Sequence, residues 1–87
     1  MRWQVVLAPR AERELKSFPD DVYRRIIRRL ELLRVNPRPR GCQKLAGHDG
    51  VYRLRAGDYR ILYRIADAVL VVMVIRIGHR RELTYIL

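Results

Sequence analysis

VYRLRAGDYRILYR, residues 51–64, is the stretch that decides the fold. Apolar and basic residues alternate on both sides of Gly57-Asp58, which is the period-two pattern of a strand with two different faces. Gly57-Asp58 is a two-residue hairpin signal, because glycine tolerates the positive φ that the favoured turns require. The stretch therefore predicts two antiparallel strands joined by a tight turn.

The register of this hairpin follows from its turn. Ala56 is expected to pair with Tyr59, which gives the hairpin one apolar and one basic face. The apolar face carries Tyr52, Leu54, Tyr59, Ile61 and Tyr63, and the basic face carries Arg53, Arg55 and Arg60. Like charges opposite one another destabilise a sheet, so the basic face indicates an anion site, and the planar guanidinium fork suits phosphate. The alternative is a solvated basic face that only keeps the protein soluble.

The chain is short and strongly basic. Its 87 residues predict one small domain over residues 1–87, and a hydrophobic fraction of 49% is enough for a modest core. Lys and Arg number 19 against 9 Asp and Glu, which gives a net charge of +10. This charge says little about the fold, but it favours nucleic acid, an acidic protein or an anionic membrane surface as the partner.

The single cysteine and the hydropathy pattern indicate the cellular compartment. Cys42 has no second cysteine to pair with, so a passive loop thiol is expected. No stretch approaches the roughly 20 apolar residues that span a bilayer, and the N-terminus lacks the pattern of a signal peptide. We therefore expect a cytoplasmic protein with no membrane partner.

Two helices are expected between a first strand and the hairpin. Residues 3–7 read as a short strand, and residues 9–17 as a short amphipathic helix that begins and ends at a proline. A longer helix should run from Asp20 to near Val35, where Pro37 disfavours helical geometry in the preceding residue. The short connection predicts an antiparallel helical hairpin. The second helix carries a basic run, either as a solvated face or as a contact for nucleic-acid backbone: Arg24, Arg25, Arg28 and Arg29.

The segments on either side of the hairpin differ in composition. Residues 36–50 are rich in proline and glycine, which predicts an exposed basic loop with Leu45 as its anchor to the core. Residues 69–77 are apolar on both faces, as is typical of a strand at the centre of a sheet. The whole pattern is β-αα-βββ, an α+β domain with a two-helix hairpin on one face of a small twisted, mainly antiparallel sheet.

The register of the last strand depends on the turn before it. If Asp67-Ala68 is that turn, Ala66 pairs with Val69, which puts Arg64 opposite Val71 and Arg60 opposite Ile75. The second apolar face of this strand then borders the arginines, and it carries Val71, Met73, Ile75 and Ile77. Such a face needs a cover, either the C-terminal segment or a partner chain.

A basic face with a histidine and tyrosines nearby suits RNA binding or RNA cleavage. Metal-ligand spacing, a glycine-rich phosphate loop and a Ser-His-Asp pattern are all missing, so no metal or other cofactor is expected. RNA can be cleaved by its own 2′-hydroxyl attacking the adjacent phosphate, and the protein then orients the backbone, stabilises charge and moves protons. His79 is the best candidate for proton transfer, and its alternative is a plain surface histidine. Tyr85 could stack on a base or dock on the core. Charge stabilisation would come from Arg53, Arg55, Arg60 and Arg80.

Three motifs lie in the second half of the chain. They are Lys44-Leu45-x-Gly47, then Tyr52-Arg53-x-Arg55-x-Gly57-Asp58-Tyr59-Arg60-x-x-Tyr63, then Gly78-His79-Arg80-Arg81 with a tyrosine near the end. Together with the order of elements, they resemble the RelE/ParE superfamily of toxins from type II toxin–antitoxin systems. The resemblance implies one of two activities: RelE-like members cleave mRNA in the ribosomal A site, and ParE-like members poison DNA gyrase. Both are held inactive by a small antitoxin.

In the RelE-like branch, the resemblance implies a role for each matching position. Arg60 and Arg80 match arginines that contact the scissile phosphate, and Tyr85 resembles a tyrosine that stacks on a base, although it comes one residue early. His79 could match a catalytic histidine near the end of the last strand. Where a lysine can act as the base in RelE-like sites, this chain has arginine, which makes His79 more attractive as the base. RNA contacts are expected at Lys44, Arg53, Arg55 and Arg81.

The basic cluster favours a ribosome-dependent endoribonuclease that inhibits translation. The alternatives are a gyrase inhibitor without nuclease activity and a non-catalytic RNA-binding module. The expected partners are the ribosome with its mRNA, and an acidic RelB-like antitoxin that folds on binding and gives a hetero-oligomeric complex.

Overall fold

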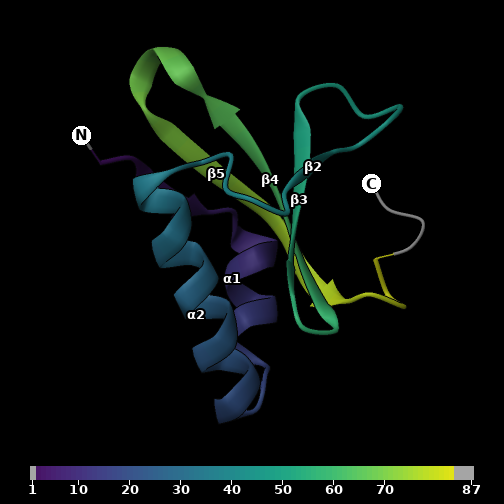
Figure 1. The fold of residues 1–87 in the computed structure, drawn as a ribbon. Helices are drawn as coiled ribbons and strands as arrows, with labels where there is room; N and C mark the ends of the chain where they lie inside the picture. The colour runs from purple at the N-terminus through teal and green to yellow at the C-terminus, as the bar shows by residue number, and fades with distance from the viewer. Residues whose placement is uncertain (1, 84–87) are drawn as a thin grey trace.

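The computed structural model describes residues 2–83, which form two helices and a five-stranded mixed sheet (Figure 1). The strand order is β1-β5-β4-β3-β2, with β1 parallel to β5 and the other pairs antiparallel. This confirms the α+β class and the β-αα-βββ order. The elements are β1 (Gln4–Leu7), α1 (Pro9–Lys16), α2 (Asp20–Val35), β2 (Gln43–Lys44), β3 (Val51–Ala56), β4 (Tyr59–Ala66), the 3-10 helix η1 (Asp67–Val69) and β5 (Val71–His79).

The β3–β4 hairpin has the predicted register. Ala56 pairs with Tyr59, Arg55 with Arg60 and Leu54 with Ile61. Gly57 adopts φ +63°, in the left-handed region that a residue with a side chain enters only with strain. The predicted apolar face packs into the core, whereas Arg53, Arg55 and Arg60 alternate onto the opposite face.

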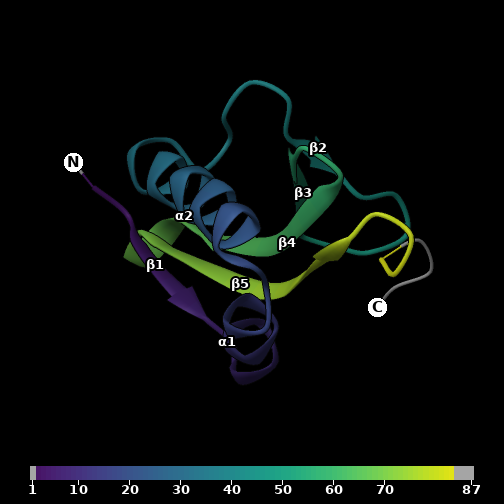
Figure 2. The ribbon, with the colours of Figure 1, turned by 90° about the horizontal axis from the view of Figure 1, so that it is seen from below.

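Both helices run over the predicted residues and pack on one face of the sheet. Ala11 and Leu15 of α1, with Ile26 and Leu33 of α2, are buried against the apolar face of the hairpin. The sheet curves around α2, and α1 lies beside β1 and β5 (Figure 2). Neither helix of the described residues is long and apolar enough to cross a membrane.

The predicted register of the last strand was wrong. Ala66 pairs with Val71 rather than Val69, because residues 67–70 form a 3-10 turn that ends at Leu70 with φ +55°. Arg64 lies opposite Met73 instead of Val71, a shift of two that leaves the faces unchanged. The strand is flanked by β1 and β4, as its two apolar faces predicted.

A β-bulge shifts the register once more near the end of β5. Leu62 pairs with Arg76 and Tyr63 with Val74, so Ile75 is an extra residue on β5. A single extra residue reverses the alternation of faces. Ile77 is therefore buried in the helix-side core rather than on the second apolar face, and Arg60 lies opposite Gly78 instead of Ile75.

The face of the sheet away from the helices has its own small core. Val51, Leu62 and Leu83 are buried together, with Leu45 and Ile75 packed against them. This confirms that Leu45 anchors the connection and that the segment after β5 docks, as far as Leu83. The predicted loop 36–50 was wrong in one respect: Gln43 and Lys44 form β2, which pairs with Arg53 and Tyr52 of β3. Met73 stays 36% exposed on this face.

The edge of β5 changes partner halfway along the strand. β1 pairs with β5 only as far as Val74, and beyond it α1 covers the edge. The carboxylate of Glu14 accepts the backbone N–H of Ile77 at 2.9 Å and the Arg76 guanidinium at 2.9 and 3.1 Å. The exposed fractions of the Arg76 and Glu14 side chains are 15% and 20%, so the pair is mostly removed from water. The bulge lies between the part of β5 that pairs with β1 and the part that contacts the Glu14 carboxylate.

A second ion pair ties the α2–β2 connection to the turn before β5. Arg38 donates to both carboxylate oxygens of Asp67, at 3.1 and 3.0 Å, and its guanidinium lies 5.4 Å from the ring centroid of Tyr52. Tyr52 stacks on Tyr63, whose buried hydroxyl donates to the carbonyl of Pro37 at 2.8 Å. Burial raises the pKa of that hydroxyl. These contacts select the longer turn that the sequence pattern did not predict.

The Arg38–Asp67 pair predicts a pH effect. Hydrogen bonding from Arg38 lowers the pKa of Asp67, so Arg38→Gln should raise that pKa toward its ordinary value. Because the folded-state pKa is the depressed one, the stabilisation by this pair is present above the unfolded-state pKa and is lost as the pH falls through the folded-state pKa. Carbon-13 NMR titration of the Asp67 carboxyl measures the shift. Arg34→Gln is the control, and an unmoved titration in Arg38→Gln would contradict the assignment.

Candidate functional site

The basic face of the hairpin meets the end of β5 at a small pocket. The pocket has a volume of about 100 Å³ and is lined by Arg55, Gly57, Asp58, Arg60 and Arg80. Arg55 and Arg60 reach it because they are paired across β3 and β4. Arg80 reaches it because Gly78 pairs with Arg60, which brings the end of β5 beside the hairpin turn. The sequence predicted this convergence, although through a different register.

Arg60 lies at the electrostatic centre of the cluster. Its pKa is lowered first by partial burial and then by the charges of Arg53, Arg55 and Arg80. A guanidinium remains protonated under any physiological condition, so the lowered pKa reports unfavourable charge rather than a neutral group. The other three predicted arginines therefore all act on Arg60 through their charges. A bound anion would relieve this repulsion, which makes the pocket suited to a phosphate.

Two neighbouring groups hold the outer arginines of the cluster. The backbone N–H of Arg80 donates to the Asp58 carbonyl at 2.8 Å, and its Nε lies 3.8 Å from Asp58 Oδ1. On the other side, the Arg53 guanidinium donates to the side-chain oxygen of Gln43 on β2. Sequence reasoning assigned no role to Asp58 or Gln43. The position of Asp58 in the turn between two basic strands was the only available signal.

His79 lies next to the cluster in sequence but on the other face of the sheet. It pairs with Tyr59, and the two rings meet edge to face at 5.4 Å. Its Nδ1 accepts the backbone N–H of Arg81 at 3.2 Å, so the neutral ring carries its proton on Nε2. To accept a proton at Nδ1, the ring has to release Arg81.

The remaining predicted positions lie around the pocket or outside the described residues. Lys44 is exposed on β2 opposite Tyr52, and Arg81 is exposed in the turn after β5. Neither lines the pocket of Arg60. Tyr85 lies outside the described residues. Within residues 2–83, no three His, Cys, Asp or Glu side chains gather in a way that could hold a metal ion.

Comparison with known proteins shows which family this chain belongs to. Residues 5–84 match the model of the ParE toxin of the type II toxin–antitoxin system parDE. A protein of Methanocaldococcus jannaschii, named as a candidate toxin RelE1, is 30% identical over 98% of this chain and 97% of its own length.

Solved structures agree with the sequence match. The archaeal RelE of a RelE–RelB complex from Pyrococcus horikoshii superposes with a TM-score of 0.80 and 29% identity, over 92% of this chain and 97% of its own. The free E. coli toxin RelE, solved as an arginine-to-alanine mutant, gives a TM-score of 0.78 and 27% identity, over 97% of this chain and 90% of its own. The chain therefore belongs to the ParE toxin family of type II toxin–antitoxin systems, within the wider RelE/ParE superfamily.

Proposed function

We propose that this toxin is a RelE-like endoribonuclease that cleaves mRNA in the ribosomal A site and so inhibits translation. The observation that supports it most is the pocket in which Arg55, Arg60 and Arg80 meet, with Arg53 within electrostatic reach. An inhibitor that only occupies a protein surface has no need for so much unfavourable charge at one point. The phosphate of an RNA that is being cleaved gains negative charge, and clustered arginines would stabilise that charge.

The proposed reaction uses the RNA's own nucleophile. The 2′-hydroxyl oxygen attacks the adjacent phosphorus, the bond to the 5′-oxygen breaks, and a 2′,3′-cyclic phosphate and a 5′-hydroxyl result. The 2′-hydroxyl loses a proton and the 5′-oxygen gains one, so the net proton count is unchanged. Arg60 and its neighbours bind the non-bridging oxygens, whose negative charge increases in the transition state. Tyr85 remains the proposed stacking partner for a base, and Lys44 and Arg81 the proposed backbone contacts.

His79 remains the proposed group for proton transfer. Arginine stays protonated, and the other groups that line the pocket are a glycine and an aspartate, so the imidazole of His79, next to Arg80 in sequence, is the group left for proton transfer. His79→Gln should therefore remove the dependence of the cleavage rate on pH between about 5 and 8. Single-turnover rates across that range measure it. An identical pH profile in the variant would show that His79 moves no proton in the reaction.

The proposed inhibitor of the toxin is a cognate antitoxin. RelE relatives have been solved in complexes with RelB from Pyrococcus horikoshii and Mycobacterium tuberculosis. The net charge of +10 and the partly exposed apolar residues of β5 (Val71, Met73 and Ile75) favour an acidic, amphipathic partner for this chain as well. The complex would keep the toxin away from the ribosome.

The test is a cell-free translation reaction with the purified toxin, in which the 5′ ends of the message are mapped by primer extension. We expect cuts within codons at the A site, and none in a reaction without ribosomes. Cuts without ribosomes would replace this proposal with a free ribonuclease. An intact message would overturn it.

The second candidate is inhibition of DNA gyrase. It is favoured by the family match, since that match is to ParE rather than to RelE. A gyrase inhibitor predicts an intact message together with protein-linked DNA breaks in a supercoiling assay with purified gyrase. The two candidates therefore give opposite results in the two assays.

A further inference from the structure

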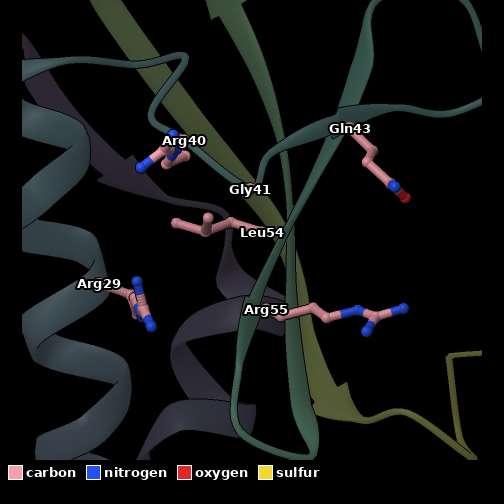
Figure 3. Close-up of a pocket in the computed structure, with 6 residues that line it drawn as sticks. All are labelled: Arg29, Arg40, Gly41, Gln43, Leu54 and Arg55. Atoms are coloured by element: carbon pink, nitrogen blue, oxygen red, sulfur yellow. The ribbon is translucent and has the colours of Figure 1, made fainter.

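A second basic pocket lies between α2 and the outer edge of β3, and no role has been given to it above. Its volume is about 320 Å³, and it is lined by Arg29, Arg40, Gly41, Gln43, Leu54 and Arg55. Arg29 and Arg40 lie on the α2 side of β3 with Leu54, whereas Gln43 and Arg55 point to the opposite side (Figure 3). The pocket thus extends around the outer edge of β3, from one side of the strand to the other.

The fold creates this opening through the short strand β2. β2 has two residues, and its pairing with β3 ends at Arg53. Among the described residues, no strand lies beside the outer edge of β3 beyond Arg53, and the chain between α2 and β2 approaches this edge instead. That connection is held by two buried prolines and by a turn in which the Cys42 N–H donates to the Pro39 carbonyl at 3.1 Å. Arg40 is therefore presented from an ordered turn.

The charges of this pocket are unbalanced. No carboxylate lines it, and within residues 2–83 Arg29, Arg40 and Arg55 form no ion pair. Other arginines of the same chain, such as Arg38 and Arg76, do have carboxylate partners. Arg29 and Arg40 on one side of β3 and Arg55 on the other have no counter-charge among these pairs, and uncompensated guanidiniums that line one pocket indicate an anionic ligand. The space beside Gly41 at the entrance is open, since a Cβ built there would meet no atom within 4 Å.

The two pockets share one residue. Arg55 lines both this pocket and the pocket of Arg60 and Arg80. A ligand with phosphates at regular intervals could therefore occupy both at once, which a single free anion could not. We propose that the Arg29–Arg40 pocket binds a second phosphate of the RNA chain whose scissile phosphate lies at Arg60. This inference rests on the proposed function, because it takes RNA as the ligand.

The test uses an RNA that binds but cannot react. A single-stranded 2′-O-methyl RNA hexanucleotide lacks the attacking hydroxyl, so binding is measured apart from cleavage. Nitrogen-15 NMR of the full chain follows the amide of Gly41 and the Nε–H groups of Arg29 and Arg40 during titration. We expect these signals to move together with those of Arg55 and Arg60. If only the Arg60 pocket responds, the second site does not exist.

Affinity measurements give an independent readout with a matched control. Arg29→Gln with Arg40→Gln should weaken binding of the hexanucleotide about tenfold and reduce the salt slope of log Kd by about 0.7, as expected for one lost phosphate contact on a single strand. Arg10→Gln with Arg13→Gln removes the same charge from exposed positions of α1 and should change the slope little. Equal effects in the two double variants would show that binding depends on net charge and not on this pocket, which would overturn the proposal.

A hexaglutamate peptide separates RNA from an acidic protein as the ligand. If the peptide shifts Gly41 and the hexanucleotide does not, the pocket binds protein and the RNA proposal is wrong. Cleavage of an unmodified message is scored separately. Cleavage that depends on Arg60 while Gly41 stays unmoved defeats only this inference. Shifts at Gly41 with an intact message defeat the proposed function, and with it the scissile phosphate at Arg60, and leave the pocket as an RNA-binding site only.

Discussion

Arg60→Gln is expected to lower cleavage of the message by a factor on the order of 10²–10³, because one preorganised donor to the developing charge contributes about that much. Arg60 is a partly buried member of the cluster, and the other three arginines act on it. Its loss therefore removes the central donor and leaves a neutral amide in its place. Mapped cut sites in a cell-free translation reaction, quantified as rates at equal toxin concentration, measure the loss.

Arg64→Gln is the matched control for Arg60. Both residues lie on β4 and alternate onto the same face, and both lose one positive charge. The Arg64 guanidinium donates to the Asp49 carbonyl at 2.7 Å, away from the pocket, so cleavage should remain within a few-fold of the unmodified protein. If both variants lose activity equally, the effect is one of net charge and not of phosphate contact. Thermal unfolding of each variant confirms that the fold is retained.

Glu14→Ala is expected to give a large loss of stability, about 2–3 kcal/mol in the free energy of unfolding. The substitution leaves the Arg76 guanidinium mostly buried without its carboxylate. It also leaves the backbone N–H of Ile77 without its acceptor at the edge of β5. Urea unfolding followed by circular dichroism measures the difference, and the midpoint should fall at unchanged slope.

Glu12→Ala is the control for that stability loss. Glu12 lies on the same helix and pairs with Lys16 at 3.0 Å, but both side chains are more than half exposed. Its removal should change the free energy of unfolding by less than about 0.5 kcal/mol, as is usual for an exposed pair four residues apart. If the Glu14 variant loses no more than the Glu12 variant, the mostly buried pair does not stabilise the edge of β5.

The hairpin could be predicted because its information is local. Period-two alternation and one glycine are enough to determine that Arg55 faces Arg60, and with it most of the charged pocket. The helices were equally accessible, since prolines mark their ends. The basic residues of the site were therefore visible before the fold was known.

The register of β5 could not be predicted because it depends on contacts that are distant in sequence. The longer turn before it is held by Arg38 through Asp67, and the bulge lies where Glu14 meets Ile77. The same limit applies to Arg29 and Arg40, which come from a helix and a turn with no shared periodicity. Local sequence patterns do not show which side chain, distant in sequence, will hydrogen-bond to or pair with a given polar group.

The pairing of β1 with β5 has a consequence for how the protein is made. The first strand of the chain finds its partner only when residues 71–74 exist, and the same last strand leads into Arg80 of the charged pocket. A nascent chain that lacks these residues has neither a complete sheet nor a complete pocket. Such distant pairing also makes the final folding step slow relative to helix formation. If the proposed function holds, a protein that stops translation stays harmless to the ribosome that synthesises it until β5 and Arg80 have been made.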